Sequence, residues 1–390
     1  MNRELELYIH IPFCIKKCAY CDFLSEQAPI EEQEKYVQAL EREINSYQRQ
    51  MEQYEITTIF LGGGTPSILK TEQIARILQA LRTVFRIKKD VEITIEVNPG
   101  TVTWEKLQGY KQAGIQRLSI GLQTVQNAEL KWLGRIHTYE QFLETYQMAR
   151  DIGYTNINID LISAIPGQTV ASWMNTLQHV IALNPEHISA YSLIIEEGTP
   201  FYEWYGPQKK IVSSLPQLPG EEEERQIYEQ TEVLLEQAGY QYYEISNYAK
   251  SGYECQHNLG YWKRTEYLGL GIGAASLLNE TRHTNCRIRE YYIAHAKDQD
   301  LIHTELETLS IKSQMEEYMF LGLRMIQGVS ESMFQYLFQS SMETVYGIQL
   351  ETLTKKGLLV REERNGQKMV RLTKRGIDVS NYVLSEFLQE

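Results

Sequence analysis

The chain has 390 residues, of which 43% are hydrophobic, and a formal net charge of −13. This size is sufficient to bury one large core and one or two smaller ones. The acidic balance excludes a broad surface for nucleic acid or anionic lipid, although a local basic patch stays open. No apolar run approaches the roughly 20 residues of a membrane span, and the first residues do not follow a signal-peptide pattern. Five cysteines, three of them clustered, argue against a disulfide scaffold and for a reducing, cytoplasmic location.

The first element expected is a buried strand over residues 7–13, which are apolar and aromatic. Cys14, Cys18 and Cys21 follow on a loop with the spacing Cys-x₃-Cys-x₂-Cys. Thiolates ligate soft metals, but a structural zinc normally takes a fourth Cys or His at a similar short spacing, and none follows. Three thiolates therefore favour a [4Fe–4S] cluster with one iron open to a non-protein ligand. Zinc, or three unrelated structural thiols, stay as alternatives.

Strands and helices then alternate along the chain. A helical period covers residues 30–55, and another helix is expected over residues 71–85. Further strands are expected at residues 57–61, 92–98, 116–123, 156–162 and 187–194. This alternation indicates a parallel sheet, and about six such units suggest an open doubly wound sheet or an incomplete barrel.

The polarity of the strands favours the barrel. Strands covered on both faces should be apolar on both faces, but these strands alternate between polar and aliphatic residues. Glu96, Gln123 and Asp160 lie near the carboxyl ends of three of them. Binding groups of such barrels come from these strand ends, so a ligand is expected at that mouth. For any one of the three, a hydrogen-bonded core residue is the alternative.

A triple glycine, residues 62–64, follows the second strand and precedes Thr65 and Pro66. It has neither the spacing of a dinucleotide-binding loop nor a Walker lysine. Glycine lets the backbone approach a ligand closely, so this turn can offer N–H and C=O groups to a polar head such as an amino-carboxylate.

Together these motifs resemble the radical S-adenosylmethionine superfamily. More narrowly, they are similar to the branch that contains oxygen-independent coproporphyrinogen III oxidase and its haem-chaperone relative. The resemblance covers essentially the whole chain and is carried by residues 8–14 (Tyr-Ile-His-Ile-Pro-Phe-Cys), 61–67 (Leu-Gly-Gly-Gly-Thr-Pro-Ser), 96–99 (Glu-Val-Asn-Pro), 119–123 (Ser-Ile-Gly-Leu-Gln) and 158–162 (Asn-Ile-Asp-Leu-Ile). It implies a partial (β/α)6 TIM-like barrel with a C-terminal helical, winged-helix-like domain.

The resemblance also implies a site. Cys14, Cys18 and Cys21 would hold the cluster, and S-adenosylmethionine would chelate the open iron and be cleaved after reduction by an electron donor. The other positions assigned to the cofactor are Tyr8, Tyr20, Gly63, Gly64, Thr65, Glu96, Gln123, Arg135 and Asp160.

Two departures favour the haem-chaperone group over the oxidase. Phe23 stands where the oxidase has a further cysteine, and only seven residues precede Tyr8. Residues 257–262, His-Asn-Leu-Gly-Tyr-Trp, resemble a signature of the chaperone group. His257 is thus a candidate axial ligand for haem, with a hydrogen-bonded core histidine as the alternative. Cys255 is a second candidate, with an inert buried thiol as the default.

The C-terminal part is expected to form helices at residues 312–326 and 333–338. A hairpin should follow from residues 357–361 and 368–372 around Asn365 and Gly366. Basic residues gather there, but Glu362 and Glu363 interrupt them, so a protein-contact or lid domain is preferred over DNA binding. The acidic run at residues 221–224 is interpreted as the first turn of a helix.

The sequence therefore predicts a radical-S-adenosylmethionine barrel over residues 1–240, a connecting segment over 241–307 and a C-terminal domain over 308–390. The predicted function is to bind haem and transfer it to an acceptor protein. The alternatives are the oxidase and, less favoured, a zinc-stabilised nucleic-acid-binding protein. No nucleic-acid partner is expected, and the composition leaves a weak membrane association open.

Overall fold

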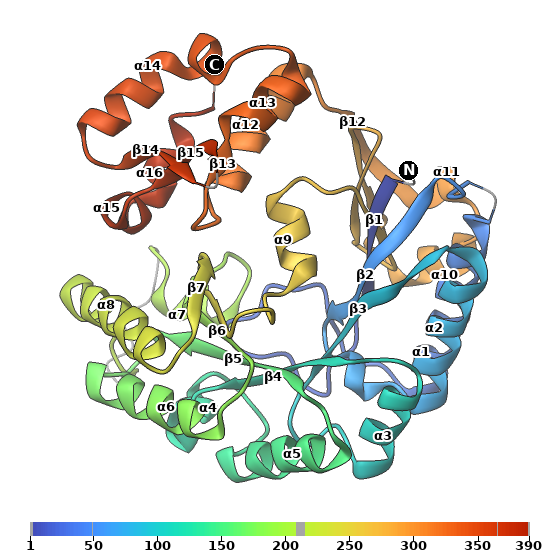
Figure 1. Cartoon of the computed structure of the whole chain (residues 1–390). Helices are drawn as coiled ribbons and strands as arrows, with labels where there is room; N and C mark the ends of the chain where they lie inside the picture. The colour runs from blue at the N-terminus through green and yellow to red at the C-terminus, as the bar shows by residue number, and fades with distance from the viewer. Residues whose placement is uncertain (1–2, 49, 208–214, 365, 389–390) are drawn as a thin grey trace.

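A 12-stranded sheet organises most of the molecule, and a separate three-stranded sheet belongs to the C-terminal part (Figure 1). The structure is a computed structural model that describes residues 3–48, 50–207, 215–364 and 366–388. The large sheet has the strand order β12-β11-β10-β9-β1-β2-β3-β4-β5-β6-β8-β7. None of the helices in the described ranges is long and apolar enough to cross a bilayer.

Six parallel strands, adjacent in chain order, form the centre of this sheet. They are β1 (Arg3–Ile11), β2 (Tyr54–Gly63), β3 (Ile87–Val97), β4 (Arg117–Gln123), β5 (Asn156–Ser163) and β6 (His187–Ser192). The connections contain α1 (Ile30–Ser46), the 3-10 turn η1 (Pro66–Ile68), α2 (Thr71–Val84), α3 (Trp104–Gln112), α4 (Asn127–Trp132), α5 (Tyr139–Ile152) and α6 (Val170–Leu183). Figure 1 shows these helices along the outer side of the curved sheet. The predicted partial barrel is confirmed, and each expected strand is present.

The sheet extends beyond the predicted barrel at both edges. On one side β9 (Tyr267–Leu270) pairs in parallel with β1, and on the other β8 (Asn247–Ala249) pairs antiparallel with β6. Residues 241–307, expected to connect two domains, thus supply edge strands; the predicted domain boundaries themselves stay a prediction. The remaining elements of this part are α7 (Pro200–Tyr205), α8 (Glu221–Gln237), β7 (Gln241–Glu244), α9 (Gln256–Trp262), β10 (Ala275–Leu278), β11 (Thr281–Asn285), α10 (Arg289–His295), α11 (Gln299–Ile302) and β12 (His303–Thr308).

The main core lies between the sheet and its outer helices. Leu5, Leu7, Ile9 and Ile11 alternate along β1, and all are fully buried in this core. The burial of one such side chain contributes about 1.5–3 kcal/mol, so the outward strand faces largely fix the helices in place. The inward faces are therefore left for the polar residues noted in the sequence. The acidic run at residues 221–224 does begin α8, as predicted.

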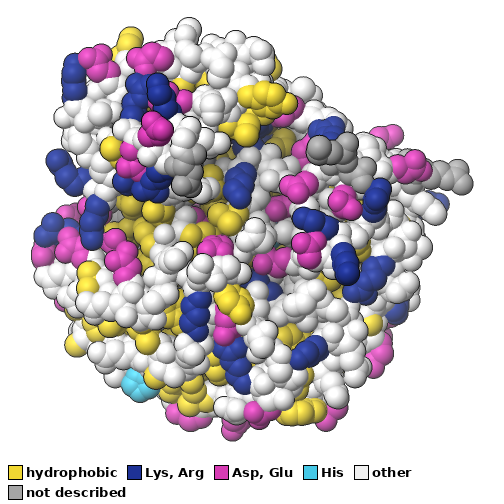
Figure 2. All heavy atoms as spheres, viewed as in Figure 1, with side chains coloured by type: hydrophobic (Ala, Val, Ile, Leu, Met, Phe, Trp, Pro, Cys, Tyr) yellow, Lys and Arg dark blue, Asp and Glu magenta, His cyan; other side chains and the backbone are white. Residues whose placement is uncertain are grey.

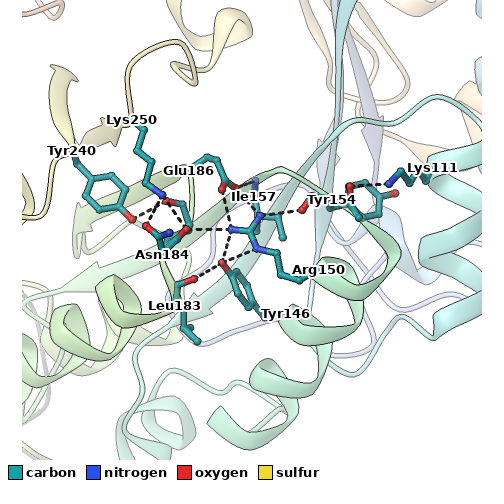
Figure 3. A network of polar contacts seen from close by, with 12 residues as sticks. Lys111, Tyr146, Arg150, Tyr154, Ile157, Leu183, Asn184, Glu186, Tyr240 and Lys250 are labelled. Carbon is teal, nitrogen blue, oxygen red and sulfur yellow. Dashed lines mark hydrogen bonds and ion pairs between the residues drawn. The ribbon is translucent and has the colours of Figure 1, made fainter.

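The amino-terminal end of the barrel is fastened by a network around Arg150 (Figure 3). Arg150 of α5 donates from Nη1 to Glu186 Oε2 at 2.8 Å and from Nη2 to Glu186 Oε1 at 3.1 Å. Glu186 Oε2 also accepts from the Ile157 amide of β5 at 3.0 Å. Lys250, which follows β8, donates to Asn184 Oδ1 at 2.6 Å. One ion pair thus joins α5, β5 and the start of β6.

The C-terminal part has its own core, in which Met319, Phe334, Tyr346 and Leu350 are buried. Its elements are α12 (Ile311–Gly322), β13 (Val329–Ser330), α13 (Glu331–Phe338), α14 (Met342–Lys355), β14 (Leu359–Arg364), β15 (Gln367–Leu372), α15 (Lys374–Asp378) and α16 (Ser380–Ser385). The predicted hairpin is present, with β14 and β15 antiparallel, whereas Asn365 lies outside the described residues.

The cations of the C-terminal part are largely paired. Arg361 contacts Glu331 and Glu343, and Arg371 contacts Glu362. On the face shown in Figure 2, basic and acidic side chains are interspersed over this part of the molecule. Pairing of this kind reduces the positive potential that nucleic acid would need.

Candidate functional site

The carboxyl ends of the central strands surround a cavity of about 520 Å³. Gly63, Glu96, Gln123, Ile162 and Ser192 line it, one from the last residues of each of five adjacent strands. Gln123 has φ 76°, a left-handed conformation that is uncommon outside glycine and that occurs often at functional sites. A cavity thus lies at the barrel mouth, where the sequence predicts a ligand; that this cavity binds the ligand stays a prediction.

The loop after β1 forms one wall of this cavity and carries three free thiols. Cys14, Cys18 and Cys21 are half-buried, and all three line the cavity. The backbone of the loop is held at Cys14, whose amide donates to Glu26 O at 3.0 Å, and at Ala19, whose amide donates to Leu133 O at 3.0 Å. The loop is therefore positioned by neighbouring segments as well as by its own sequence.

The surroundings of the thiols suit cluster ligands. Arg135 Nη1 donates to Cys18 Sγ at 3.7 Å, and Thr65 Oγ1 lies 3.5 Å from Cys14 Sγ. Burial raises the pKa of the Cys21 thiol to about 11, so without a metal ion this thiol keeps its proton, which a cluster iron would displace. Within the described ranges, no three His, Cys, Asp or Glu side chains converge around a single-ion position. Three thiols on one cavity wall, without a fourth protein ligand, fit a [4Fe–4S] cluster in which three of the four irons take one thiolate each.

Two carboxylates lie on the wall of the cavity that the strand ends form. Glu96 Oε2 accepts from the Gly63 amide at 3.1 Å, and Asp160 Oδ2 accepts from Ser119 Oγ at 2.9 Å. Burial, together with the charge of Asp160, raises the pKa of Glu96 to about 8. Burial likewise raises the pKa of Asp160, although its hydrogen bonds to Ser119 and Asn158 oppose the shift. A ligand with an amino group and hydroxyl groups could donate hydrogen bonds to these two carboxylates, which fits S-adenosylmethionine.

Glycine is required at two positions where the backbone packs closely against neighbouring atoms beside the cavity. A Cβ on Gly64 would lie 2.7 Å from Phe13 O, and one on Gly121 would lie 3.0 Å from Asn98 Oδ1. At Gly64 the contact is too short for any residue with a Cβ atom. At Gly121 it is tight, so the Asn98 side chain would have to shift. The triple glycine therefore serves a close approach between the β2 turn and the cysteine loop, in addition to any contact with a ligand.

A chain of polar side chains joins this wall to the thiols. Arg135 Nη2 donates to Asn98 Oδ1 at 2.6 Å and to Gly121 O at 2.7 Å, and Asn98 Nδ2 donates to Thr65 Oγ1 at 2.7 Å. Since Arg135 and Thr65 also contact Cys18 and Cys14, the wall of strand ends is connected to two of the thiols. The Nε of Arg135 is buried without a partner among the described residues.

Sequence reasoning missed several residues of the cavity. Asn98 and Ser119 continue the polar strand faces, so their alternation with Glu96 and Gln123 was the available signal. His137 also lines the cavity; its Nε2 is buried without a partner among the described residues. Burial and the neighbouring Arg135 charge lower the pKa of His137 to about 3. Nothing in the local sequence distinguished this histidine.

Two predicted site residues lie outside the cavity lining: Tyr8 and His257. The Tyr8 hydroxyl lies 3.0 Å from His10 Nδ1, and its ring stacks on Phe60 with centroids 6.4 Å apart. The other predicted residues, from Cys14 to Asp160, all line the cavity. The role of Tyr8 against the cofactor stays a prediction.

His257 is a buried, hydrogen-bonded residue of the barrel interior. Its Nδ1 lies 2.6 Å from Thr58 Oγ1, and its Nε2 lies 3.1 Å from the Tyr261 hydroxyl. Its ring stacks on Phe60 at a centroid distance of 5.1 Å. Burial lowers the pKa of His257 to about 3, which keeps the imidazole neutral. Both ring nitrogens thus have hydrogen-bond partners. This geometry matches the alternative that the sequence left open, a hydrogen-bonded core histidine. Ligation of haem iron by His257 would require α9 to move.

The segment that carries His257 is attached to the same polar interior as the cavity. Glu92 Oε1 accepts from the Gln256 amide at 3.0 Å and caps the start of α9. A chain of hydrogen bonds runs from Asp160 through Asn158, His187 and Tyr243 to the Cys255 amide, with donor–acceptor distances of 2.7, 2.6, 2.8 and 3.2 Å. The cavity and α9 therefore share one network. Cys255 is buried, and burial raises the pKa of its thiol to about 12, as expected for an inert thiol.

Comparisons with known proteins agree with this geometry. The family described as the radical SAM superfamily matches residues 8–180, and the HemN C-terminal domain matches residues 309–379. A Bacillus subtilis protein named heme chaperone HemW is 36% identical over 387 residues, which are 98% of this chain and 99% of the relative. A Lactococcus lactis protein of the same name is 35% identical over 388 residues, 100% of this chain and 98% of the relative. The solved structure of coproporphyrinogen III oxidase (HemN) from Escherichia coli matches with a TM-score of 0.84 and 25% identity, covering 99% of this chain and 90% of that one.

Proposed function

Because the chain belongs to the radical SAM superfamily and, within it, to the family of proteins named heme chaperone HemW, we propose that it binds haem and transfers it to an acceptor protein. The observation that carries this proposal is identity along nearly the full length of both chains, at 36% over 98% of this one. The match extends through the C-terminal part, so it concerns the whole molecule and not a shared barrel alone.

Within this function, Cys14, Cys18 and Cys21 are proposed to ligate a [4Fe–4S] cluster, and the cavity behind them to bind S-adenosylmethionine. When bound, these groups supply one-electron chemistry at a sulfonium, for which an electron donor is a proposed partner. Glu96 would accept hydrogen bonds from the amino group of the ligand, and Asp160 from its hydroxyls. Arg135 would orient Cys18 by its contact at 3.7 Å. The five free thiols suit a reducing, cytoplasmic location, which stays part of the proposal.

Phe23 supports the chaperone over the related oxidase. It lines the cavity beside the thiols, at the position where the resemblance assigns the oxidase a further cysteine. A phenyl ring has no thiol that could ionise or donate a proton, so Phe23 cannot take over the chemistry of that cysteine. It can contribute apolar contact area instead.

The test uses anaerobically purified protein with its iron and labile sulfide quantified. Haem titration should give a saturable absorbance change at one haem per chain, and the haem should then move to apomyoglobin, used as a generic acceptor. The same preparation, given reductant, S-adenosylmethionine and coproporphyrinogen III, should form no protoporphyrinogen IX. Formation of that product, or the lack of saturable haem binding, would reject the chaperone function.

A further inference from the structure

Four large apolar side chains that are more than half exposed surround the mouth of the cavity. They are Ile15 (51%), Phe23 (59%), Ile136 (53%) and Ile194 (67%), and all four line the cavity. We name this set the apolar rim. Its members come from three separate segments: the cysteine loop, the loop after α4 and the loop after β6. Single exposed apolar side chains are ordinary on protein surfaces, but a group gathered around a concavity is typical of a binding surface.

The inner part of the cavity is polar, whereas its exposed edge is apolar. Glu96, Asp160 and Ser119 line its inner wall, and these suit a polar ligand. The apolar rim lies at the exposed edge, where those polar groups do not reach. A polar cofactor held by the inner wall would leave the rim uncovered, so the rim suits a second, larger and mostly apolar ligand.

Two cations stand beside the rim. Lys16 and Lys17 lie between the cysteines, are exposed and line the same cavity. Across the described parts of the chain, neither is in an ion pair. Asp22 and Glu196 are the exposed carboxylates of this lining. A ligand with an apolar ring and carboxylates at one edge would fit here, because the ring could pack against the rim and the carboxylates could pair with the two lysines.

The buried histidine of α9 offers no comparable surface. His257 is 2% exposed, and both of its ring nitrogens have hydrogen-bond partners. It lies outside the cavity lining, so a macrocycle could reach it only after α9 had left the barrel interior. The apolar rim needs no such rearrangement.

We propose that the apolar rim is the haem site, with the macrocycle packed against Ile15, Phe23, Ile136 and Ile194 and its propionates on Lys16 and Lys17. This inference rests on the proposed function and adds to it the place of binding. Haem would then cover the mouth of the cofactor cavity, so both ligands would occupy one continuous site.

Metal-free protoporphyrin IX is the sharpest probe, because it keeps the ring and the propionates but cannot take an axial ligand. Its affinity is measured by fluorescence on cluster-loaded protein. Ile194→Asp and Phe23→Asp should each weaken binding by about tenfold or more, since each places a charge against the ring and removes an apolar contact. Ile348→Asp is the matched control: Ile348 is 80% exposed on α14, away from the cavity, and its variant should bind like the wild type.

The role of the lysines is tested with the double variant Lys16→Glu, Lys17→Glu. It should weaken binding of protoporphyrin IX about tenfold and leave binding of its dimethyl ester unchanged, because the ester has no carboxylate to repel. Lys297→Glu, at an exposed position between α10 and α11, is the control and should not affect either probe. All variants are compared at equal iron and sulfide content, which shows that the cysteine loop still assembles its cluster.

The outcomes separate the two proposals. If the wild type binds no haem, the proposed function fails, and the rim site fails with it. If the wild type binds haem and the rim variants bind both haem and protoporphyrin IX as well as it does, the rim is not the site while the function stands. Loss of protoporphyrin binding in His257→Ala, with intact binding in Ile194→Asp, would also overturn the rim site.

Discussion

The two ends of the barrel are built for different tasks. At the amino-terminal end, Arg150 and Glu186 satisfy each other and the groups around them, and their side chains are mostly shielded, at 22% and 13% exposure (Figure 3). At the carboxyl end, three free thiols, two carboxylates with raised pKa values and the apolar rim face one cavity. The first end pairs its charges with each other, whereas the second keeps two buried carboxylates without a cation in contact among the described residues and three thiols facing a cavity. Changes at the two ends should therefore separate stability from binding.

The largest expected effect is at the thiols. Cys18→Ala should remove almost all iron and labile sulfide from the purified protein, because a cluster with only two protein thiolates loses the chelate. Its unfolding midpoint should stay near that of the cluster-free wild type. Cys286→Ala, a buried thiol outside the cavity, is the control and should retain the full cluster content. An iron content in Cys18→Ala equal to the wild type would contradict the assignment of the ligands.

The opposite result is expected at the other end. Arg150→Ala should lower the free energy of unfolding by about 2–3 kcal/mol, because it leaves the partly buried Glu186 carboxylate without its cation. Urea denaturation measures this loss. Cluster content and haem affinity should match the wild type, since no residue of the network lines the cavity.

The matched control is the exposed pair of Lys355 and Glu351, with side-chain exposures of 73% and 65%. Lys355→Ala should leave the midpoint nearly unchanged, because water already screens this pair. Equal losses in the two variants would show that burial does not decide the contribution of these ion pairs.

A pH dependence should report the buried carboxylates. Burial raises the pKa of Glu96 to about 8, so near neutral pH the free protein holds this carboxyl mostly protonated. An amino group that donates hydrogen bonds to Glu96 favours the ionised carboxylate, and binding of S-adenosylmethionine therefore releases a proton from Glu96. Affinity should rise from pH 6 to pH 7.5, by up to about tenfold per pH unit. In Glu96→Gln the affinity should be weaker and nearly flat over this range; a wild-type affinity that falls over the same range would contradict the pairing.

The smallest effect is expected in the hydrogen-bond chain that joins the cavity to α9. Tyr243→Phe removes the hydroxyl that contacts His187 Nε2 at 2.8 Å and accepts from the Cys255 amide at 3.2 Å. Loss of these hydrogen bonds should lower the free energy of unfolding by about 1–2 kcal/mol. Affinity for S-adenosylmethionine should change less than twofold if the network only supports the fold. A larger change would show that α9 and the cavity are energetically coupled.

Much of the cofactor site was predictable because its signals are local. The period-2 alternation of the strands placed Glu96, Gln123 and Asp160 on one face, and parallel strands bring their carboxyl ends together. The spacing of Cys14, Cys18 and Cys21 is a local signal as well, and it indicated three ligands on one loop. Arg135 was named only through the resemblance, since nothing in the sequence around it shows that its guanidinium contacts Cys18 at 3.7 Å.

The sequence by itself determined the order of strands and helices in the central barrel, the cysteine loop and the polar faces of the strands, since each follows from spacing over a few residues. Only the tertiary structure decided that β9 pairs with β1, that α9 enters the barrel interior and that His257 is enclosed there. It also gathered the apolar rim from three loops that are distant in sequence. The physical reason is the same in each case: hydrophobic period tells which face of an element is buried, but not which distant segment buries it.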